Sequence, residues 1–447
     1  MSIAASARIA GWTAPRAGSD VPDPESLDRC GHCTLAAERM AAWEHAVRQA
    51  ALALPGCVRR ADVVRLAYID PLSGPASDVG RNGLLSWQFL AEHLSAEANP
   101  ARLRFEVAGF DNKGSPQESL HALRAAIDQG FRIVLQGNGS GVASTLSAAI
   151  ERHNERFPQR GVVLLNYAAM DPSLTRERCS FWHFRVDADT AMKTQALVAY
   201  LAQDTPWRRV ALLNQNYAHG QQVSGWWQRK ADEMDAGLSV VSDDLHPAFI
   251  LRDFGPWVRR VQASGAQVLV TGNWGVDLQR LIGAMQEQGL DLPVFGYYTH
   301  LPGMPSLLAD SRRPTPVYQV GGSHTNQPGP LSSLMARFRA RHREDLVVTS
   351  AYDGLVLLAQ AIARAGSTSA TDLARQMSGM SFDGFDGPVT LRSADHQLQK
   401  GLYINRWQPT DSVHPIGAEG TGHTFAPVRY FAGVAVSQPA QCGMVRR

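Results

Sequence analysis

Residues 132–149, RIVLQGNGSGVASTLSAA, decide how the chain is interpreted. The apolar run at 133–135 predicts a short strand buried inside a parallel sheet. A polar turn with three glycines follows at 136–141, and the composition from Val142 onward favours a helix. A helix that starts directly after a strand leaves unpaired backbone N–H groups at its positive end, and these groups can hold a carboxylate or amide oxygen. The simpler interpretation, a tight turn that binds nothing, stays open at this point.

A second stretch of the same design lies at 267–285, QVLVTGNWGVDLQRLIGAM. It again predicts a strand at 268–270, a glycine turn at 271–275 and an amphipathic helix. Two such units, well separated in the chain, favour two α/β lobes that each present a helix N-terminus. The working hypothesis is therefore one ligand held between two lobes.

Length and composition narrow the class of protein. With 447 residues, the chain is long enough for two domains with sizeable cores. Its net charge of +2 and its 19% of charged residues provide no basic field for nucleic acid or for an anionic membrane surface. No apolar run is long enough to span a bilayer as a helix, so no membrane span is expected.

From Asp62 the chain alternates between predicted strands and helices, which indicates parallel, doubly wound sheets. After Trp407 no clear period follows, and this end of the chain is expected to be irregular. Ligands on such sheets bind at the carboxyl ends of the strands. The candidate contacts at these ends are Ser73, the 137–141 loop and the turn at 167–170 in one lobe, and Tyr217, Trp274, Tyr297 and Tyr298 in the other.

Residues 1–61 differ from the rest of the chain. Much of this segment is rich in Ala, Gly, Ser, Pro and Asp, which predicts a poorly ordered N-terminal extension or a degenerate export segment. The best candidate for an export signal begins at Met40, but charged residues interrupt its apolar core. The residues before Cys57 weakly resemble a lipoprotein cleavage box, which leaves lipidation of this cysteine open.

The other cysteines allow two kinds of chemistry. The CxxC pair at 30–33 has the spacing of a metal or redox site, but no second pair and no strand–CxxC–helix context accompanies it. Cys179 and Cys442 lie far apart in the sequence and can form a disulfide in an exported protein. The alternative is two unrelated thiols.

The sequence predicts no enzyme. A nucleophile elbow, a zinc-protease helix and a Walker phosphate loop are all missing from it. His219, His300 and His324 are isolated, without a second metal ligand at helical spacing. We therefore expect no catalytic residues, no cofactor and no metal.

Several short segments, in the same order along the chain, resemble the leucine/isoleucine/valine-type solute-binding proteins of ABC transporters. They are DPLSGP at 70–75, FDNKG at 110–114, QGNGSG at 136–141, LNYAA at 165–169, FWHFRVD at 181–187, LNQNY at 213–217, DDLHP at 243–247 and TGNWG at 271–275. They cover most of the chain from Val63 onward. The chain is thus identified as a member of that family.

The resemblance implies the type I periplasmic binding protein fold, in which two doubly wound lobes are joined by three crossovers. The implied domains are residues 62–184 with 322–388 for the first lobe, and 185–321 with 389–447 for the second. The lobes would close over a small ligand by a hinge motion near Arg185, Gly321 and Pro388. The implied role is a periplasmic protein that delivers its ligand to an inner-membrane ABC permease.

The resemblance also assigns the ligand contacts. The loop that holds the ligand carboxylate matches Asn138, Gly139 and Ser140, and the backbone contact after the fourth strand matches Ala168. In the second lobe, the closing aromatic residue matches Trp274, and Tyr217 lies near another contact position.

Two positions depart from the amino-acid binders of the family. Met170 stands where these proteins use a threonine hydroxyl, and Tyr297 or Tyr298 stands where they use a glutamate for the ligand ammonium. A buried ammonium without an anion is costly, so the change argues against a standard α-amino acid. A neutral amide, a urea-like compound or an aromatic acid is favoured, while a small shift in register keeps branched-chain amino acids open.

One alternative function stays open at the sequence level. The same fold serves cytoplasmic regulators that sense an amide or amino acid and release a partner protein. The unconvincing export signal is the only support for this alternative, and free thiols at Cys179 and Cys442 would add to it.

Overall fold

The computed structural model describes residues 63–447 except 97–98, 100–101, 312–314 and 329–330. The extension predicted at 1–61, with its cysteine pair at 30–33 and Cys57, lies outside the described residues. Within the described part, two large sheets and one small sheet organise the chain.

The first sheet is entirely parallel, with the strand order β2-β1-β3-β4-β5. Its strands are β1 (Val63–Asp70), β2 (Arg104–Asp111), β3 (Ile133–Gln136), β4 (Val163–Asn166) and β5 (His183–Arg185). β3 and β4 are buried at every position, as expected for central strands covered on both faces. The helices that follow β1, β2 and β3 are α2 (Ser77–Ala96), α3 (Pro116–Asp128) and α4 (Ser140–Arg156).

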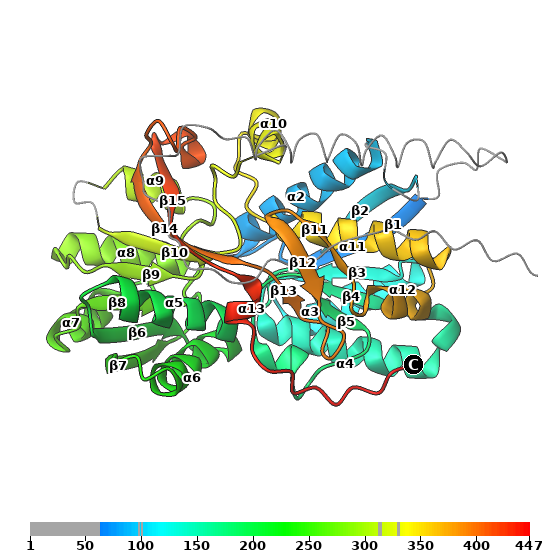
Figure 1. The fold of residues 1–447 in the computed structure, drawn as a ribbon, viewed down its shortest axis with the longest axis horizontal. Helices are drawn as coiled ribbons and strands as arrows, with labels where there is room; N and C mark the ends of the chain where they lie inside the picture. The colour runs from blue at the N-terminus through cyan, green and yellow to red at the C-terminus, as the bar shows by residue number, and fades with distance from the viewer. Residues whose placement is uncertain (1–62, 97–98, 100–101, 312–314, 329–330) are drawn as a thin grey trace, which may run out of the picture. The chain divides into compact units, whose positions relative to one another are not determined.

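Later parts of the chain complete the first lobe. α10 (Ser332–His342), α11 (Ser350–Ala365) and α12 (Ala370–Met377) contribute buried side chains to the same core as the first sheet. A small antiparallel sheet of β11 (Ser381–Gly384), β12 (Gly387–Leu391) and β13 (Leu398–Gln399) joins this core through Phe382, Val389 and Leu398. Figure 1 shows these orange and yellow elements beside the blue and cyan ones.

The second sheet has the order β15-β14-β10-β9-β8-β6-β7, and its five strands from β10 to β7 are parallel. These are β6 (Arg209–Gln215), β7 (Ser239–His246), β8 (Val268–Thr271), β9 (Val294–Gly296) and β10 (Val317–Gly321). Side chains of β6 alternate between two cores, Leu212 in one and Leu213 in the other, because helices cover both faces. The covering helices are α5 (Thr190–Asp204), α6 (Ala218–Glu233), α7 (Gly255–Ala263), α8 (Val276–Gln288) and α9 (Met304–Ala309).

The edge of the second sheet differs from the sequence prediction. β14 (Leu402–Pro409) and β15 (His423–Phe431) pair antiparallel, so the expectation of an irregular end after Trp407 is wrong for β15. Pro427 interrupts the pattern of β15, and the register shifts between Ile404 and Asn405 opposite it. A proline inside an edge strand beside such an irregularity hides the strand from pattern analysis.

The two lobes are joined by three crossovers, as predicted: between β5 and α5, between β10 and α10, and between β13 and β14. The third crossover falls at 399–402, since Leu398 packs in the core of the first lobe and Leu402 in that of the second. Pro388 lies within β12, away from this crossover. The two-lobed α/β fold is confirmed, while the domain boundaries at single residues stay a prediction.

The C-terminal tail returns from the second lobe to the first. α13 (Gly433–Val436) buries Val436 in a core of the second lobe, whereas Met444 packs against the core of the first. A disulfide bond joins Cys179 to Cys442. Figure 1 shows this red tail running from α13 to the C-terminus.

Candidate ligand-binding site

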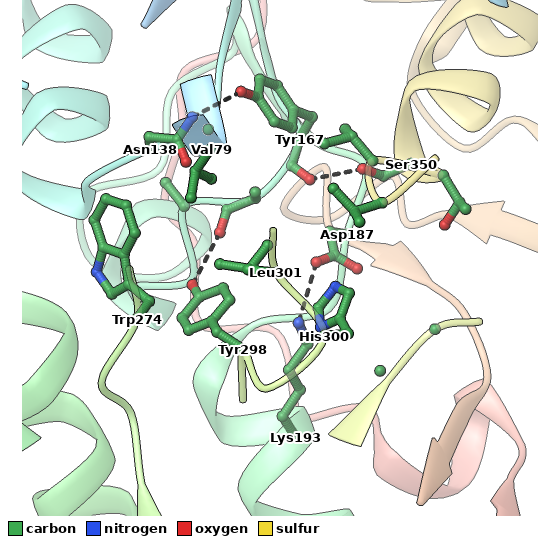
Figure 2. Close-up of a pocket in the computed structure, with 18 of the residues that line it drawn as sticks. Val79, Asn138, Tyr167, Asp187, Lys193, Trp274, Tyr298, His300, Leu301 and Ser350 are labelled. Atoms are coloured by element: carbon green, nitrogen blue, oxygen red, sulfur yellow. Dashed lines mark hydrogen bonds and ion pairs between the residues drawn. The ribbon is translucent and has the colours of Figure 1, made fainter. Parts of the chain in front are cut away.

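A pocket lies where the strand ends of the two large sheets face each other (Figure 2). It encloses about 830 Å³, part of it continuous with solvent. Seven residues that the sequence predicts as ligand contacts line it: Asn138, Gly139, Ser140, Ala168, Tyr217, Trp274 and Tyr298. The structure thus brings together the two glycine turns from which the two-lobe hypothesis started.

Asp70, at the end of β1, holds the glycine turn of the first lobe in place. Its carboxylate accepts the backbone N–H groups of Gly137 and Asn138, each at 2.9 Å, and the hydroxyl of Tyr167 at 2.5 Å. Burial raises the pKa of Asp70 to about 7, and these hydrogen bonds oppose the rise. A Cβ at Gly137 would lie only 2.4 Å from the ring of Tyr167, so glycine is required at this position.

The start of α4 is open toward the pocket. Gly139 occupies the N-cap with φ +96°, and no side chain caps the helix. The first N–H groups of α4, beginning at Ser140, therefore lack an intrahelical partner at the positive end of the helix dipole. This arrangement provides the predicted seat for a carboxylate or amide oxygen.

Aromatic side chains of the second lobe form the opposite wall. Trp274 donates its indole N–H to the hydroxyl of Tyr217 at 2.8 Å, and its ring lies 6.4 Å from that of Tyr298. Tyr298 reaches across to the carbonyl oxygen of Ala168 in the first lobe, at 3.5 Å (Figure 2). Trp274 also packs with Val79 and Leu301 in one apolar cluster, so both lobes supply this wall.

Three of the predicted contacts lie outside the pocket. Ser73 is exposed and donates to Asp111 at 2.6 Å within its turn, which is the capping role that polar turn residues often have. Met170 is fully buried in a core of the second lobe. Tyr297 is fully buried there too, and its hydroxyl bonds to that of Thr194 at 2.7 Å. Tyr297 points into the core while Tyr298 lines the pocket, because neighbouring residues after a strand point in opposite directions.

The pocket contains charged side chains that sequence reasoning did not select. Asp187, at the first crossover, pairs with Lys193 of α5 at 3.2 Å (Figure 2). Lys400, at the third crossover, pairs with Asp353 of α11 at 3.0 Å. Only the position of Asp187 inside the family-like segment 181–187 gave a signal in the sequence, and Lys400 gave none.

Asp187 changes the argument about the ligand. The absence of a glutamate at Tyr297 or Tyr298 does not leave the pocket without a carboxylate, because Asp187 supplies one from the crossover. Although burial opposes ionisation, Lys193 and Lys400 lower the pKa of Asp187 below its ordinary value. The pocket therefore holds an ionised carboxylate, paired with Lys193, that can also contact a ligand ammonium, and α-amino acids are not excluded.

Asp386 adds a pH-dependent element behind Lys400. Both of its carboxylate oxygens are buried without a hydrogen-bond partner. Burial raises its pKa to about 8; Asp353 and Asp187 add to this rise, and Lys400 opposes it. Because the folded protein holds this proton more tightly than the unfolded chain, Asp386 makes the protein less stable as the pH rises from about 4 to about 8.

We expect Asp386→Asn to remove this contribution. The free energy of unfolding of the variant, minus that of the wild type, should increase with pH between about 5 and 8, by at most about 1.4 kcal/mol per pH unit. Urea unfolding at four pH values measures it, and titrating groups that do not interact with Asp386 cancel in the difference. Asp383→Asn, at an exposed position of the same hairpin, is the matched control. A difference for Asp386→Asn that does not depend on pH would contradict the assignment.

No group of three or more His, Cys, Asp or Glu side chains in the described part of the chain is arranged to hold a metal ion. No helix of the described ranges has the length and apolar character needed to cross a membrane.

Comparisons with known proteins agree with this geometry. The family model described as periplasmic binding protein matches residues 63–412. A Leu/Ile/Val-binding protein homolog 4 of Brucella abortus (strain 2308) is 27% identical over 408 residues, which cover 89% of this chain and 96% of that protein.

Solved structures show the same fold. A leucine-, isoleucine-, valine-, threonine- and alanine-binding protein from Brucella ovis, in a closed conformation, superposes with a TM-score of 0.76 at 25% identity, covering 87% of this chain and all of that one. An ABC transporter solute-binding protein from Rhodopseudomonas palustris HaA2, in complex with p-hydroxybenzoic acid, gives a TM-score of 0.70 at 16% identity, covering 83% of this chain and 98% of that one.

Proposed function

Because this chain belongs to the periplasmic binding protein family, we propose that it is the extracytoplasmic solute-binding protein of an ABC importer. Its relatives are solute-binding proteins, and the chain is not an enzyme. The single observation that carries the proposal is the pocket, which the strand ends of both lobes line and which Tyr298 and Ala168 bridge.

The chemistry of the pocket favours a small amino-acid-like or amide-like ligand. A carboxylate or amide oxygen fits the open start of α4 near Ser140. A ligand ammonium or amide N–H fits Asp187, and an apolar group fits the wall of Val79, Trp274 and Leu301. The Brucella ovis protein is named for five amino acids, which carry both a carboxylate and an ammonium, and the Rhodopseudomonas protein was solved with p-hydroxybenzoic acid, which carries a carboxylate on an apolar ring.

Ligand capture would use a hinge motion of the two lobes. We place the hinges at the three crossovers, near Asp187, Gly321 and Lys400, the last in place of the predicted Pro388. Ligand contacts made on both sides of the cleft exist only when the lobes are closed, so the ligand shifts the equilibrium toward the closed form. An inner-membrane permease would then recognise that form.

The disulfide supports export over the cytoplasmic sensor. Cys179 and Cys442 are bonded to each other, and such bonds persist mainly in oxidising compartments. The cytoplasmic-sensor alternative predicts free thiols at Cys179 and Cys442, so the bond between them counts against it. Counting free thiols in the native protein distinguishes the two, because the sensor predicts that both cysteines are free.

A thermal-shift screen of the full chain tests the proposal. The probes are leucine, isoleucine, valine, acetamide, urea and 4-hydroxybenzoate, with glucose as the control. A probe at about 100 to 1,000 times its dissociation constant should stabilise the protein by about 2.7–4.1 kcal/mol. Failure of every probe, with a well-folded protein, would contradict the proposed ligand class.

A further inference from the structure

A second cavity adjoins the ligand pocket. It encloses about 420 Å³, solvent-open space included, and shares His300, Gln319, Ser323 and Val347 with the first pocket. We call it the far chamber. Its own lining includes His324, Thr325 and Asp345.

A chain of hydrogen bonds fixes the proton of His300. The side-chain amide nitrogen of Asn405 donates to the backbone carbonyl oxygen of Ser323 at 3.1 Å, and a carbonyl oxygen can only accept. The same nitrogen donates to the amide oxygen of Gln319 at 3.0 Å. The amide nitrogen of Gln319 must then donate to Nδ1 of His300, at 3.0 Å. Nδ1 accepts, so in the neutral ring Nε2 carries the proton and is a donor.

The polar groups of the far chamber carry no free charge. Burial, together with the charge of Lys193, lowers the pKa of His300 to about 4, although Asp187 opposes this effect. Burial also lowers the pKa of His324 to about 4, so both rings are neutral at pH 7. Asp345 is already paired with Arg339 and accepts the backbone N–H of Glu419.

One residue that lines the far chamber has a buried polar atom without a partner. Nδ1 of His324 is buried and makes no hydrogen bond with the described residues. A buried polar atom without a partner is costly, and a neutral group of a ligand can satisfy it without introducing an uncompensated charge.

We propose that the ligand site continues past His300 into the far chamber and accepts an amino acid whose side chain ends in an uncharged amide or urea group. The inference rests on the proposed function, and it names the ligand class for the same site. The α-carboxylate and ammonium take the start of α4 and Asp187. The side chain passes Val347 and Ser323, where its carbonyl oxygen accepts from Nε2 of His300.

The first test compares side chains of similar length on the full-length protein by isothermal titration calorimetry. Glutamine and citrulline carry the neutral amide and urea, norleucine replaces them by an apolar chain, and glutamate by a charge. We expect glutamine or citrulline to bind about tenfold or more tighter than norleucine and glutamate, because only the neutral polar groups satisfy the chamber. Equal or weaker binding would overturn the inference.

A variant tests the role of His300. His300→Phe keeps a ring but removes the donor, so the ratio of the norleucine to the glutamine dissociation constant should fall about tenfold, toward one. His121→Phe, at an exposed position of α3, is the matched control and should keep the wild-type ratio. An unchanged ratio in a folded His300→Phe variant would overturn the inference. If that variant does not fold, the comparison of the four ligands on the wild-type protein remains the test.

The two proposals fail in different ways. If leucine or 4-hydroxybenzoate stabilises the protein but glutamine and citrulline bind no better than norleucine, only the inference about the far chamber falls. If none of these small solutes binds, the ligand class of the proposed function falls with it.

Discussion

Replacing Lys400 by methionine is expected to lower the free energy of unfolding by about 3–5 kcal/mol, because it leaves a buried carboxylate without its counter-ion. The side chains of Lys400 and Asp353 are 2% and 1% exposed, and their charged atoms lie 3.0 Å apart. Burial disfavours the charge on Lys400, yet Asp353, Asp187 and Asp386 raise its pKa above the ordinary value. At pH 7 the ammonium is thus the shared counter-ion of Asp353 and Asp187, while Asp386 is mostly protonated.

Urea unfolding of the ligand-free protein at pH 7 measures this loss. Lys113→Met, at an exposed lysine, is the matched control and should change the stability by less than about 0.5 kcal/mol. The double variant Asp353→Asn/Lys400→Met should regain much of the stability, since it removes both charges and keeps an oxygen for the N–H of Phe385. A loss below about 1 kcal/mol in the single variant would show that the pair is not buried as described.

Asp187→Asn is expected to weaken binding of an α-amino acid by about thirtyfold or more, corresponding to a loss of at least about 2 kcal/mol. Asparagine keeps the size of the side chain but removes the negative charge that faces a ligand ammonium. The pairing with Lys193 is lost in the same step, so the ligand-free variant should also have a lower melting temperature.

A matched pair of ligands separates these two effects. Leucine carries the ammonium, and 4-methylpentanoate is the same molecule without it. Calorimetry on both proteins should show a large loss for leucine and a much smaller change for 4-methylpentanoate, whatever happens to stability. Asp78→Asn, an exposed position on α2, serves as the control variant. Equal losses for both ligands would mean that Asp187 acts through the fold and not through the ammonium.

The parts of the site that local sequence encodes could be predicted. The glycine turn before α4 and the turn at Trp274 each follow a short apolar strand, and a parallel sheet places such turns at its carboxyl edge. Sequence distance does not matter for this inference, because each turn is recognised on its own. The two-lobed fold could be predicted for the same reason.

Residues of the site outside the two glycine turns could not be found in this way. Asp187, Lys400 and His300 come from three separate segments, and no local pattern marks any of them as a ligand contact. Their meaning depends on a juxtaposition that only the tertiary fold creates. The predictions of Met170 and Tyr297 as ligand contacts were wrong for a simpler reason. A shift of one position after a strand turns a side chain from the cleft into the core.

The bond between Cys179 and Cys442 has a mechanical consequence for the lobes. It closes a covalent ring that contains every strand of the second sheet, from β6 to β15. Val436 is anchored in the second lobe, and only the six steps from there to Cys442 connect it to Cys179. A fully stretched segment of that length spans about 20 Å, so the tail acts as a fourth connection with a fixed maximum reach. In the oxidised protein the tail therefore limits how far the two lobes can separate, and reduction of this single disulfide removes that limit.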